Sequence, residues 1–254
     1  SCFGLSGESL FKEDIPLNRF ELERIVEMSF EEFTSNLLPD TVEEALTSEK
    51  SLMIVMNTIA SAEATFKKIL ELPGVEAEKL YYLSTKVPPE VRRQRIQTIK
   101  DEGGSCILVT TQLVEAGVDL DFDYCIRDMG PLDSIVQVAG RVNRSGKKEA
   151  GKIKLIELTD FNNHRAPSKI YDSVLLSATR RTMNYTLYNE SELYSLVEDY
   201  FKVIEESGFE MKSKEILESI YKLEFAKIAD FKLIDDSGRT FPVFLEIDEN
   251  AEAA

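Results

Sequence analysis

Apolar and polar positions follow a block pattern through the centre of the chain, between residues 48 and 160. Short apolar runs, each long enough for a strand buried on both faces, alternate with longer stretches in which apolar residues recur at helical spacing. Strands and helices that alternate in this way favour an α/β fold, in which helices cover both faces of a parallel sheet. The pattern predicts strands at 51–57, 79–84, 105–110, 124–127 and 152–158, and helices at 58–72 and 88–102.

The flanking segments have a different character. Apolar residues at helical spacing predict further helices at 168–183, 191–207 and 213–226, and two apolar runs at 231–234 and 241–247 bracket a turn sequence typical of a hairpin. The first 47 residues contain scattered apolar positions among many acids, which we interpret as a mostly helical connector or arm. The pattern therefore divides the chain into a connector (1–47), a central lobe (48–160) and a mainly helical C-terminal accessory region (161–254).

The net charge of −16 belongs mainly to the flanks. Residues 1–47 carry a net charge of −8 and residues 161–254 carry −7, whereas residues 48–160 carry only −1. Overall charge governs solubility and long-range steering more than it governs what one pocket binds. The acidic total is therefore compatible with a phosphate-binding site in the central lobe.

Side chains for metal or nucleophilic chemistry are scarce. The three cysteines lack metal-ligand spacing, and Cys106 and Cys125 lie in apolar runs, where a small buried hydrophobic side chain is the simpler interpretation. His164 is the only histidine, so chemistry that needs a histidine cluster is excluded, including a histidine–aspartate nuclease. No apolar run is long enough to cross a bilayer. We expect no metal bound by this chain alone, no membrane partner and a reducing, cytoplasmic location.

The segment 137–144 carries the strongest chemical signal, because it reads Q-x-x-G-R-x-x-R. On one helix, Gln137, Arg141 and Arg144 would form a single stripe, since residues three and four apart are neighbours. Guanidinium groups match the geometry of phosphate oxygens. Gly140 costs about 1 kcal/mol in a helix interior relative to Ala, so its presence suggests close approach by a bulky group or another backbone. We predict contacts with a polyphosphate; the simpler interpretation is a surface helix with two arginines.

A second motif, Thr111-x5-Gly117-x-Asp119, follows the strand predicted at 105–110. Hydroxyl groups and exposed backbone at the end of a strand suit sugar–phosphate contacts. Asp119 has two interpretations at this point: it accepts hydrogen bonds from a ribose hydroxyl, or it caps a turn of its own backbone. Ligands of parallel sheets bind beyond the carboxyl ends of the strands, where this motif is expected.

A third pattern, at residues 146–153, matches G-x-x-x-x-G-K but is not interpreted as a phosphate loop. Ile153 stands where a true phosphate loop has the Ser or Thr that binds magnesium. The segment also precedes a predicted strand, whereas a true phosphate loop follows a strand. We interpret it as a basic turn.

The first two motifs together resemble motifs V and VI of the second RecA-like lobe of superfamily 2 helicases. The fuller sequence is similar to the CRISPR-associated helicase of type I systems, strongly over residues 48–160 and only in outline elsewhere. The segments that carry the similarity are 111–121 (TQLVEAGVDLD), 130–134 (GPLDS) and 137–146 (QVAGRVNRSG). The resemblance implies a RecA-like fold and an ATP-dependent translocase or helicase that acts on single-stranded DNA in CRISPR interference.

The resemblance also implies roles for single residues. Arg144 would be the arginine finger on the γ-phosphate, with Arg141 and Gln137 assisting, and such a finger contributes on the order of 10³–10⁵ in rate. The nucleotide and its sugar would contact Gly117, Asp119 and Gly140. The residues implied to contact single-stranded DNA all lie at predicted strand ends: Asn57, Thr58, Ser84, Thr85, Thr110, Thr111 and Gln112. Positions 83–85 read Leu-Ser-Thr where a His-Ser-Arg type sequence is common in the family, which leaves the contacts near Ser84 open.

The sequence contains only part of a helicase ATP site, because it has no genuine phosphate loop and no Asp-Glu-x-His box for magnesium. The resemblance therefore implies that ATP and Mg²⁺ are shared with a first RecA-like lobe and that this chain alone is inactive. It also implies single-stranded DNA and the CRISPR surveillance complex as partners. Two alternatives remain: another superfamily 2 motor acting on RNA or DNA, and a non-catalytic adaptor that retains the lobe as a docking surface.

Overall fold

The structure is a computed structural model of the 254-residue chain. It describes residues 18–25, 27–115, 118–159, 167, 170–207 and 211–229. The chain divides into two compact units, residues 1–207 and 208–254. The second unit contains α8 (Met211–Tyr221) and α9 (Phe225–Ala229), and the hairpin predicted at 231–247 lies outside the described residues. Among the described helices, none combines the length and the apolar character that crossing a bilayer requires.

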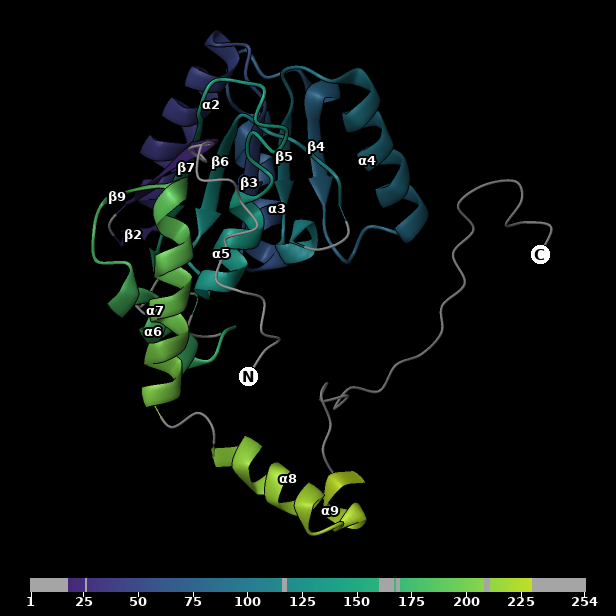
Figure 1. Cartoon of the computed structure of the whole chain (residues 1–254). Coiled ribbons are helices and arrows are strands. Elements are labelled where there is room, and N and C mark those ends of the chain that lie inside the picture. The colour runs from purple at the N-terminus through teal and green to yellow at the C-terminus, as the bar shows by residue number, and fades with distance from the viewer. Residues whose placement is uncertain are drawn as a thin grey trace, which may run out of the picture. The chain divides into compact units, whose positions relative to one another are not determined.

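A seven-stranded sheet with the order β4-β5-β3-β6-β7-β1-β9 forms the centre of the first unit (Figure 1). All neighbouring strands pair in parallel except β1 and β9, which are antiparallel. A small second sheet pairs β2 (Met28–Ser29) with β8 (Leu158–Thr159). The strands of the large sheet are β1 (Phe20–Arg24), β3 (Leu52–Val55), β4 (Leu80–Leu83), β5 (Ile107–Thr110), β6 (Tyr124–Asp128), β7 (Gly151–Ile156) and β9 (Leu187–Asn189).

Helices pack on both faces of this sheet (Figure 1), which confirms the predicted α/β class. One face carries α1 (Phe30–Glu32), a π-helical turn (Phe33–Leu37), α2 (Leu38–Thr47) and α3 (Ile59–Leu70). The other face carries α4 (Pro89–Glu102), α5 (Leu132–Ala139), α6 (Ser173–Thr182) and α7 (Leu193–Glu206). Single 3₁₀ turns are η2 (Ala77–Lys79), η3 (Gln112–Val114) and η5 (Glu190–Glu192).

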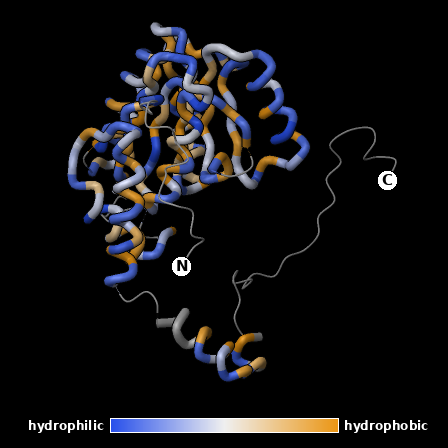
Figure 2. The backbone as a smooth tube through the Cα atoms, in the orientation of Figure 1, coloured by the Kyte–Doolittle hydropathy of each residue, from blue (hydrophilic) through white to orange (hydrophobic). Residues whose placement is uncertain are grey.

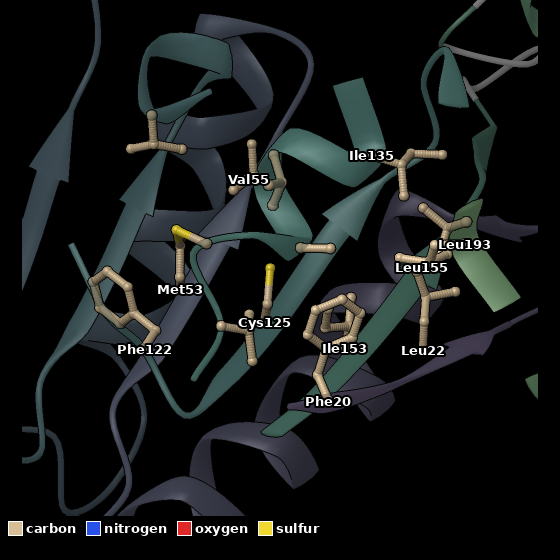
Figure 3. Packing of buried hydrophobic residues seen from close by; sticks show 14 of the residues in the cluster. Phe20, Leu22, Met53, Val55, Phe122, Cys125, Ile135, Ile153, Leu155 and Leu193 are labelled. Atoms are coloured by element: carbon tan, nitrogen blue, oxygen red, sulfur yellow. The ribbon is translucent and has the colours of Figure 1, made fainter. Parts of the chain in front are cut away.

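Each face of the sheet has its own apolar cluster, and β3 contributes to both. Side chains alternate between the two faces of a strand, so Leu52 and Ile54 lie in one cluster while Met53 and Val55 lie in the other. All four are fully buried. Figure 2 shows hydrophobic positions concentrated along the strands, and Figure 3 shows Met53 and Val55 within the second cluster. This burial on both faces explains why the central strands read as continuous apolar runs.

Residues 20–24 form strand β1, which lies between β7 and β9, where the sequence analysis expected a mostly helical arm. The sequence Phe-Glu-Leu-Glu-Arg alternates with a period of two, so Phe20 and Leu22 point into the core while Glu21 and Glu23 are exposed. Figure 3 shows both apolar side chains beside residues of β7. The arm is helical only from residue 30 onwards in its described part. The proposed division at residues 47 and 160 stays a prediction.

Gly151 explains the phosphate-loop-like pattern at residues 146–153. It is the first residue of β7, as expected for a turn that leads into a strand. A Cβ atom at this position would lie 2.7 Å from the carbonyl oxygen of Asp123 and would clash with the side chain of Val142. The glycine is therefore required for close packing of backbone and side chains inside the lobe.

Replacing Leu22 by Ala should lower the free energy of unfolding by about 2–5 kcal/mol, because it opens a cavity in a fully buried position. The matched control Glu23→Ala changes an exposed position of the same strand and should cost less than about 0.5 kcal/mol. Urea unfolding followed by circular dichroism measures both. An equal decrease in the free energy of unfolding in the two variants would show that β1 does not pack into the core.

Candidate functional site

The segment 137–144 is not one continuous helix. Helix α5 ends at Ala139 and Gly140 is its C-cap residue, so only Gln137 lies on the helix, while Arg141 and Arg144 lie in the turn that follows. The prediction of a single helical stripe is therefore wrong. A Cβ atom on Gly140 would meet only ordinary contacts at 3.5 Å or more, so nothing in the described part of the chain approaches this glycine closely.

A long-range bridge causes the helix to end there. The backbone N–H of Phe122 donates to the carbonyl oxygen of Arg141 at 2.9 Å, and the N–H of Asn143 donates to the carbonyl oxygen of Phe122 at 2.8 Å. Asn143 adopts a left-handed conformation with φ of 43°, which Asn tolerates better than most residues. Its side-chain amide donates to the backbone carbonyls of Lys148 and Glu149, which follow the turn, and to that of Arg19 at 3.0 Å. The conformation of the turn is thus fixed by contacts with residues distant in the sequence, so the local sequence does not predict it.

The Arg141 guanidinium is held by the 3₁₀ turn η3. Its Nε donates to the carbonyl oxygen of Val114 at 3.2 Å, and its Nη2 donates to the carbonyl oxygen of Glu115 at 3.0 Å. These bonds use two of the five N–H groups of a guanidinium. Partial burial lowers the pKa of Arg141, and the nearby positive charge of Arg144 lowers it further. The two arginines are therefore neighbours, as the motif predicted.

Arg144 forms an ion pair with the carboxylate of Asp119, which also accepts a hydrogen bond from Lys100 Nζ at 3.2 Å. The Arg144 side chain is 43% exposed and that of Asp119 is 69% exposed. The hydrogen bond from Lys100, and next the charge of Arg144, lower the pKa of Asp119. Asp119 thus binds two cationic side chains, and within the described residues its carboxylate accepts no backbone N–H. The carboxylate of Asp121 accepts the Arg144 backbone N–H at 2.8 Å.

The remaining residues of the expected nucleotide site are placed less completely. Gln137 is exposed, and its side chain makes no hydrogen bond within the part of the chain that the structure describes. Gly117 lies outside the described residues. Their contacts with a nucleotide stay predictions.

The residues expected to contact DNA gather at one edge of the sheet, because β4, β5 and β3 are neighbours and parallel. Most of their side chains face the protein. The buried hydroxyl of Thr110 donates to the carbonyl oxygen of Thr111 at 3.2 Å, and that of Ser84 accepts the N–H of Lys86 at 3.2 Å. The buried members of the set are Asn57, Ser84, Thr110 and Thr111.

Three further residues of this set are less buried. The Thr58 hydroxyl caps α3 by accepting the N–H of Ser61 at 2.9 Å. The side chain of Gln112 donates to the carbonyl oxygen of Asn57 at 2.9 Å. Thr85 is exposed. The structure therefore brings the set together, but leaves few of its side chains directed at solvent.

Arg127 is a further functional candidate, which the sequence motifs did not indicate. Its side chain is fully buried, and its Nη1 donates to Asn57 Oδ1 at 2.7 Å. Its Nη2 donates to Glu115 Oε1 at 3.0 Å, to Ser134 Oγ at 2.8 Å and to Tyr171 Oη at 3.1 Å. The available signal was a single charged pair, Arg127 and Asp128, at the end of an otherwise apolar run. A buried charge requires such partners.

Two carboxyl groups beside this arginine are shifted by burial. Burial raises the pKa of Asp128 to about 7, although the Arg127 charge and the backbone N–H of Leu158 act in the opposite direction. Burial also raises the pKa of Glu115, against the hydrogen bond from Ser134 and the charge of Arg127. The strand-end edge therefore contains an acid that titrates near neutral pH.

The two described cysteines, Cys106 and Cys125, are free thiols. Burial raises the pKa of Cys106 to about 11 and that of Cys125 to about 12. Within the described ranges, no group of three His, Cys, Asp or Glu residues is arranged to hold a metal ion. His164 lies outside these ranges.

Comparisons with known proteins identify the region that contains this site. Residues 48–147 match the family described as CRISPR-associated nuclease/helicase Cas3, C-terminal. The CRISPR-associated nuclease/helicase Cas3 of Methanothermobacter thermautotrophicus is 35% identical over 139 residues, which are 52% of this chain and 16% of that protein. The chain therefore spans about a sixth of that relative's length.

Solved structures show the same fold. The crystal structure of T. fusca Cas3 with ADP superposes with a TM-score of 0.65 at 21% identity, over 87% of this chain and 28% of that one. A chain of a CRISPR RNA-guided surveillance complex, in a pre-nicking state, superposes with a TM-score of 0.58 at 22% identity. The superposition covers 87% of this chain and 30% of that one. At this level of identity the likeness establishes a RecA-like α/β fold.

Asp128→Asn should change how stability depends on pH. A carboxyl group whose pKa is raised in the folded state stays protonated after the unfolded chain has lost its proton, so its contribution to stability is lost as pH rises from about 4 to about 7. The variant lacks this loss, so its free energy of unfolding relative to the unmodified chain should increase over that range. Urea unfolding at several pH values measures the difference. A difference independent of pH would contradict a raised pKa at Asp128.

Proposed function

Residues 48–147 belong to the C-terminal helicase lobe of the Cas3 family, and on this premise we propose that the chain is the second RecA-like lobe of an ATP-dependent single-stranded DNA translocase and helicase of CRISPR interference. ATP and Mg²⁺ bind between this lobe and a first RecA-like lobe. The cytoplasm is the proposed location. The chain alone does not hydrolyse ATP, because the cradle for the β- and γ-phosphates belongs to the first lobe.

The observation that carries this proposal is the pair of guanidinium groups beside Asp119. Arg141 has three N–H groups left after its two bonds to η3, and Arg144 is exposed next to it. Two permanent positive charges beside each other suit a polyphosphate held from the opposite side.

Arg144 must leave Asp119 to reach a γ-phosphate. An exposed ion pair is a weak contact, whereas an arginine finger contributes on the order of 10³–10⁵ in rate. Lys100 stays on Asp119 after the exchange and prevents an uncompensated carboxylate. Asp119 is then available to accept a ribose hydroxyl, with Gly117 and Gly140 allowing the nucleotide to approach and Gln137 assisting the arginines.

Single-stranded DNA is proposed to pass over the ends of β4, β5 and β3. Because the hydroxyls of Ser84, Thr110 and Thr111 are buried, backbone N–H groups and the exposed Thr85 are the more suitable phosphate contacts in this lobe. Such contacts position a nucleic acid without reading its sequence. The fold shared with the chain of a CRISPR RNA-guided surveillance complex supports that complex as the partner.

Arg144→Ala in the enzyme joined to its first lobe should lower kcat for ATP hydrolysis by about 10³-fold or more, with a smaller change in KM, because a finger acts mainly in the transition state. The matched control is Arg93→Ala, which breaks an exposed ion pair with Glu90 on α4 and should leave turnover unchanged. Steady-state ATPase kinetics with saturating single-stranded DNA provide both values. Full activity of the Arg144 variant would contradict the role of this residue.

The chain by itself should show no ATPase activity and should gain it when the first lobe is added. Coupled-enzyme assays with and without the first lobe test this division. Robust hydrolysis by the chain alone would overturn it, and absence of activity in the joined protein would favour an adaptor. Stronger stimulation by single-stranded RNA than by single-stranded DNA would favour another superfamily 2 motor.

A further inference from the structure

The hydrogen-bond network around Arg127 lies where three segments meet. Asn57 follows β3, Glu115 follows η3, and Ser134 belongs to the first turn of α5. Tyr171, which precedes α6, brings a fourth segment, since its hydroxyl donates to Asn57 Oδ1 at 3.2 Å. A single guanidinium therefore joins elements that are far apart in the sequence.

Stability alone does not account for this network. Replacing a buried ion pair by apolar residues of similar volume is often neutral or stabilising. Among the residues that the structure describes, the buried Nε of Arg127 also has no hydrogen-bond partner, which adds a desolvation cost. The value of the network therefore lies in what it holds in place.

What it holds is Glu115. The carboxylate of this residue accepts hydrogen bonds from Arg127 and, at 2.7 Å, from Ser134 Oγ. The backbone carbonyl of the same residue accepts the hydrogen bond from Arg141 Nη2 at 3.0 Å. Glu115 thus connects the two arginines: its carboxylate is bound by the buried Arg127, and its carbonyl binds Arg141 of the candidate nucleotide site.

The position of the Arg141 side chain depends on Glu115, because few other hydrogen bonds hold it. It lies beyond the end of α5, and its side chain bonds only to the carbonyl oxygens of Val114 and Glu115 within the described part of the chain. These two carbonyls belong to a single 3₁₀ turn and its C-cap. A turn of this length has weak intrinsic stability, so side-chain contacts fix its orientation.

We propose that Arg127 is a positioning residue that fixes the direction of the Arg141 guanidinium by anchoring the carboxylate, and through it the backbone, of Glu115. The relevance of this link to ATP hydrolysis rests on the proposed function. The link itself is a property of the folded chain and is testable without nucleotide.

The direct test is chemical modification of the full 254-residue chain with an arginine-selective dicarbonyl reagent, mapped by mass spectrometry. In Arg127→Met, the reactivity of Arg141 should rise by about tenfold, as expected when a hydrogen bond of a charged group is lost. Reactivity of the exposed Arg144 should not change. Unchanged reactivity of Arg141 in a folded Arg127→Met chain would overturn the proposal.

The matched control is Arg180→Met. It breaks another largely buried arginine–glutamate pair, between Arg180 on α6 and Glu157, which involves no residue of the candidate site. Arg141 reactivity should stay at the value of the unmodified chain in this variant. An equal rise in both variants would mean that general loosening of the fold exposes Arg141, and would also overturn the proposal.

If Arg127→Met does not fold, the double variant Arg127→Met with Glu115→Met replaces both charges and keeps the volume apolar, which such sites often tolerate. It lacks the same anchor, so the same rise in Arg141 reactivity is expected.

In the joined enzyme, Arg127→Met should lower kcat by about 10- to 100-fold with a smaller change in KM for ATP, because displacing a catalytic group by about 1 Å has an effect of this order. If Arg141 becomes reactive but turnover is unchanged, the positioning role is upheld and the role of Arg141 in the proposed function fails. The two failures are thereby distinguishable.

Discussion

Parallel pairing of β3 with β5 on one side and with β6 on the other is the constraint on which the candidate site depends. Its register places Thr110 and Arg127 on either side of Val55. Because the three strands run in the same direction, the segments that follow them begin at one edge of the sheet. Asn57 and Arg127 therefore form a direct hydrogen bond although 70 positions separate them in the sequence. The meeting of these segments is a consequence of strand order.

The central strands were predictable because burial on both faces leaves a clear mark in the sequence, namely uninterrupted apolar runs such as 52–55. Strand β1 has only five residues and alternates acidic with apolar positions, so its signal competes with that of the helix that follows from residue 30. Strand β9 is shorter still. Both strands are stabilised by pairing with strands that are distant in the sequence, and the local sequence pattern does not predict this pairing.

At the candidate site, the sequence predicted which residues converge but not what holds them. The two arginines do lie together, yet α5 ends before them because a bridge to Phe122, distant in the sequence, redirects the chain at Val142. The role of Arg127 was hidden for a related reason. A single arginine at the end of an apolar run does not reveal its partners, and those partners come from four different segments. Local sequence propensity predicts single helices and strands, whereas the contacts of a site form between elements that are distant in the sequence.

The two arginine–carboxylate contacts of the site differ in a way that suits their proposed roles. The pair of Arg144 with Asp119 is exposed, and such pairs exchange partners at little cost. The pair of Arg127 with Glu115 is buried on the arginine side, and removing one partner from such a pair is strongly unfavourable. One contact can thus yield to an incoming phosphate, while the other keeps η3 and Arg141 in place. A lobe that receives its ligand from across an interface needs both, because one arginine has to move while the surface beneath it stays fixed.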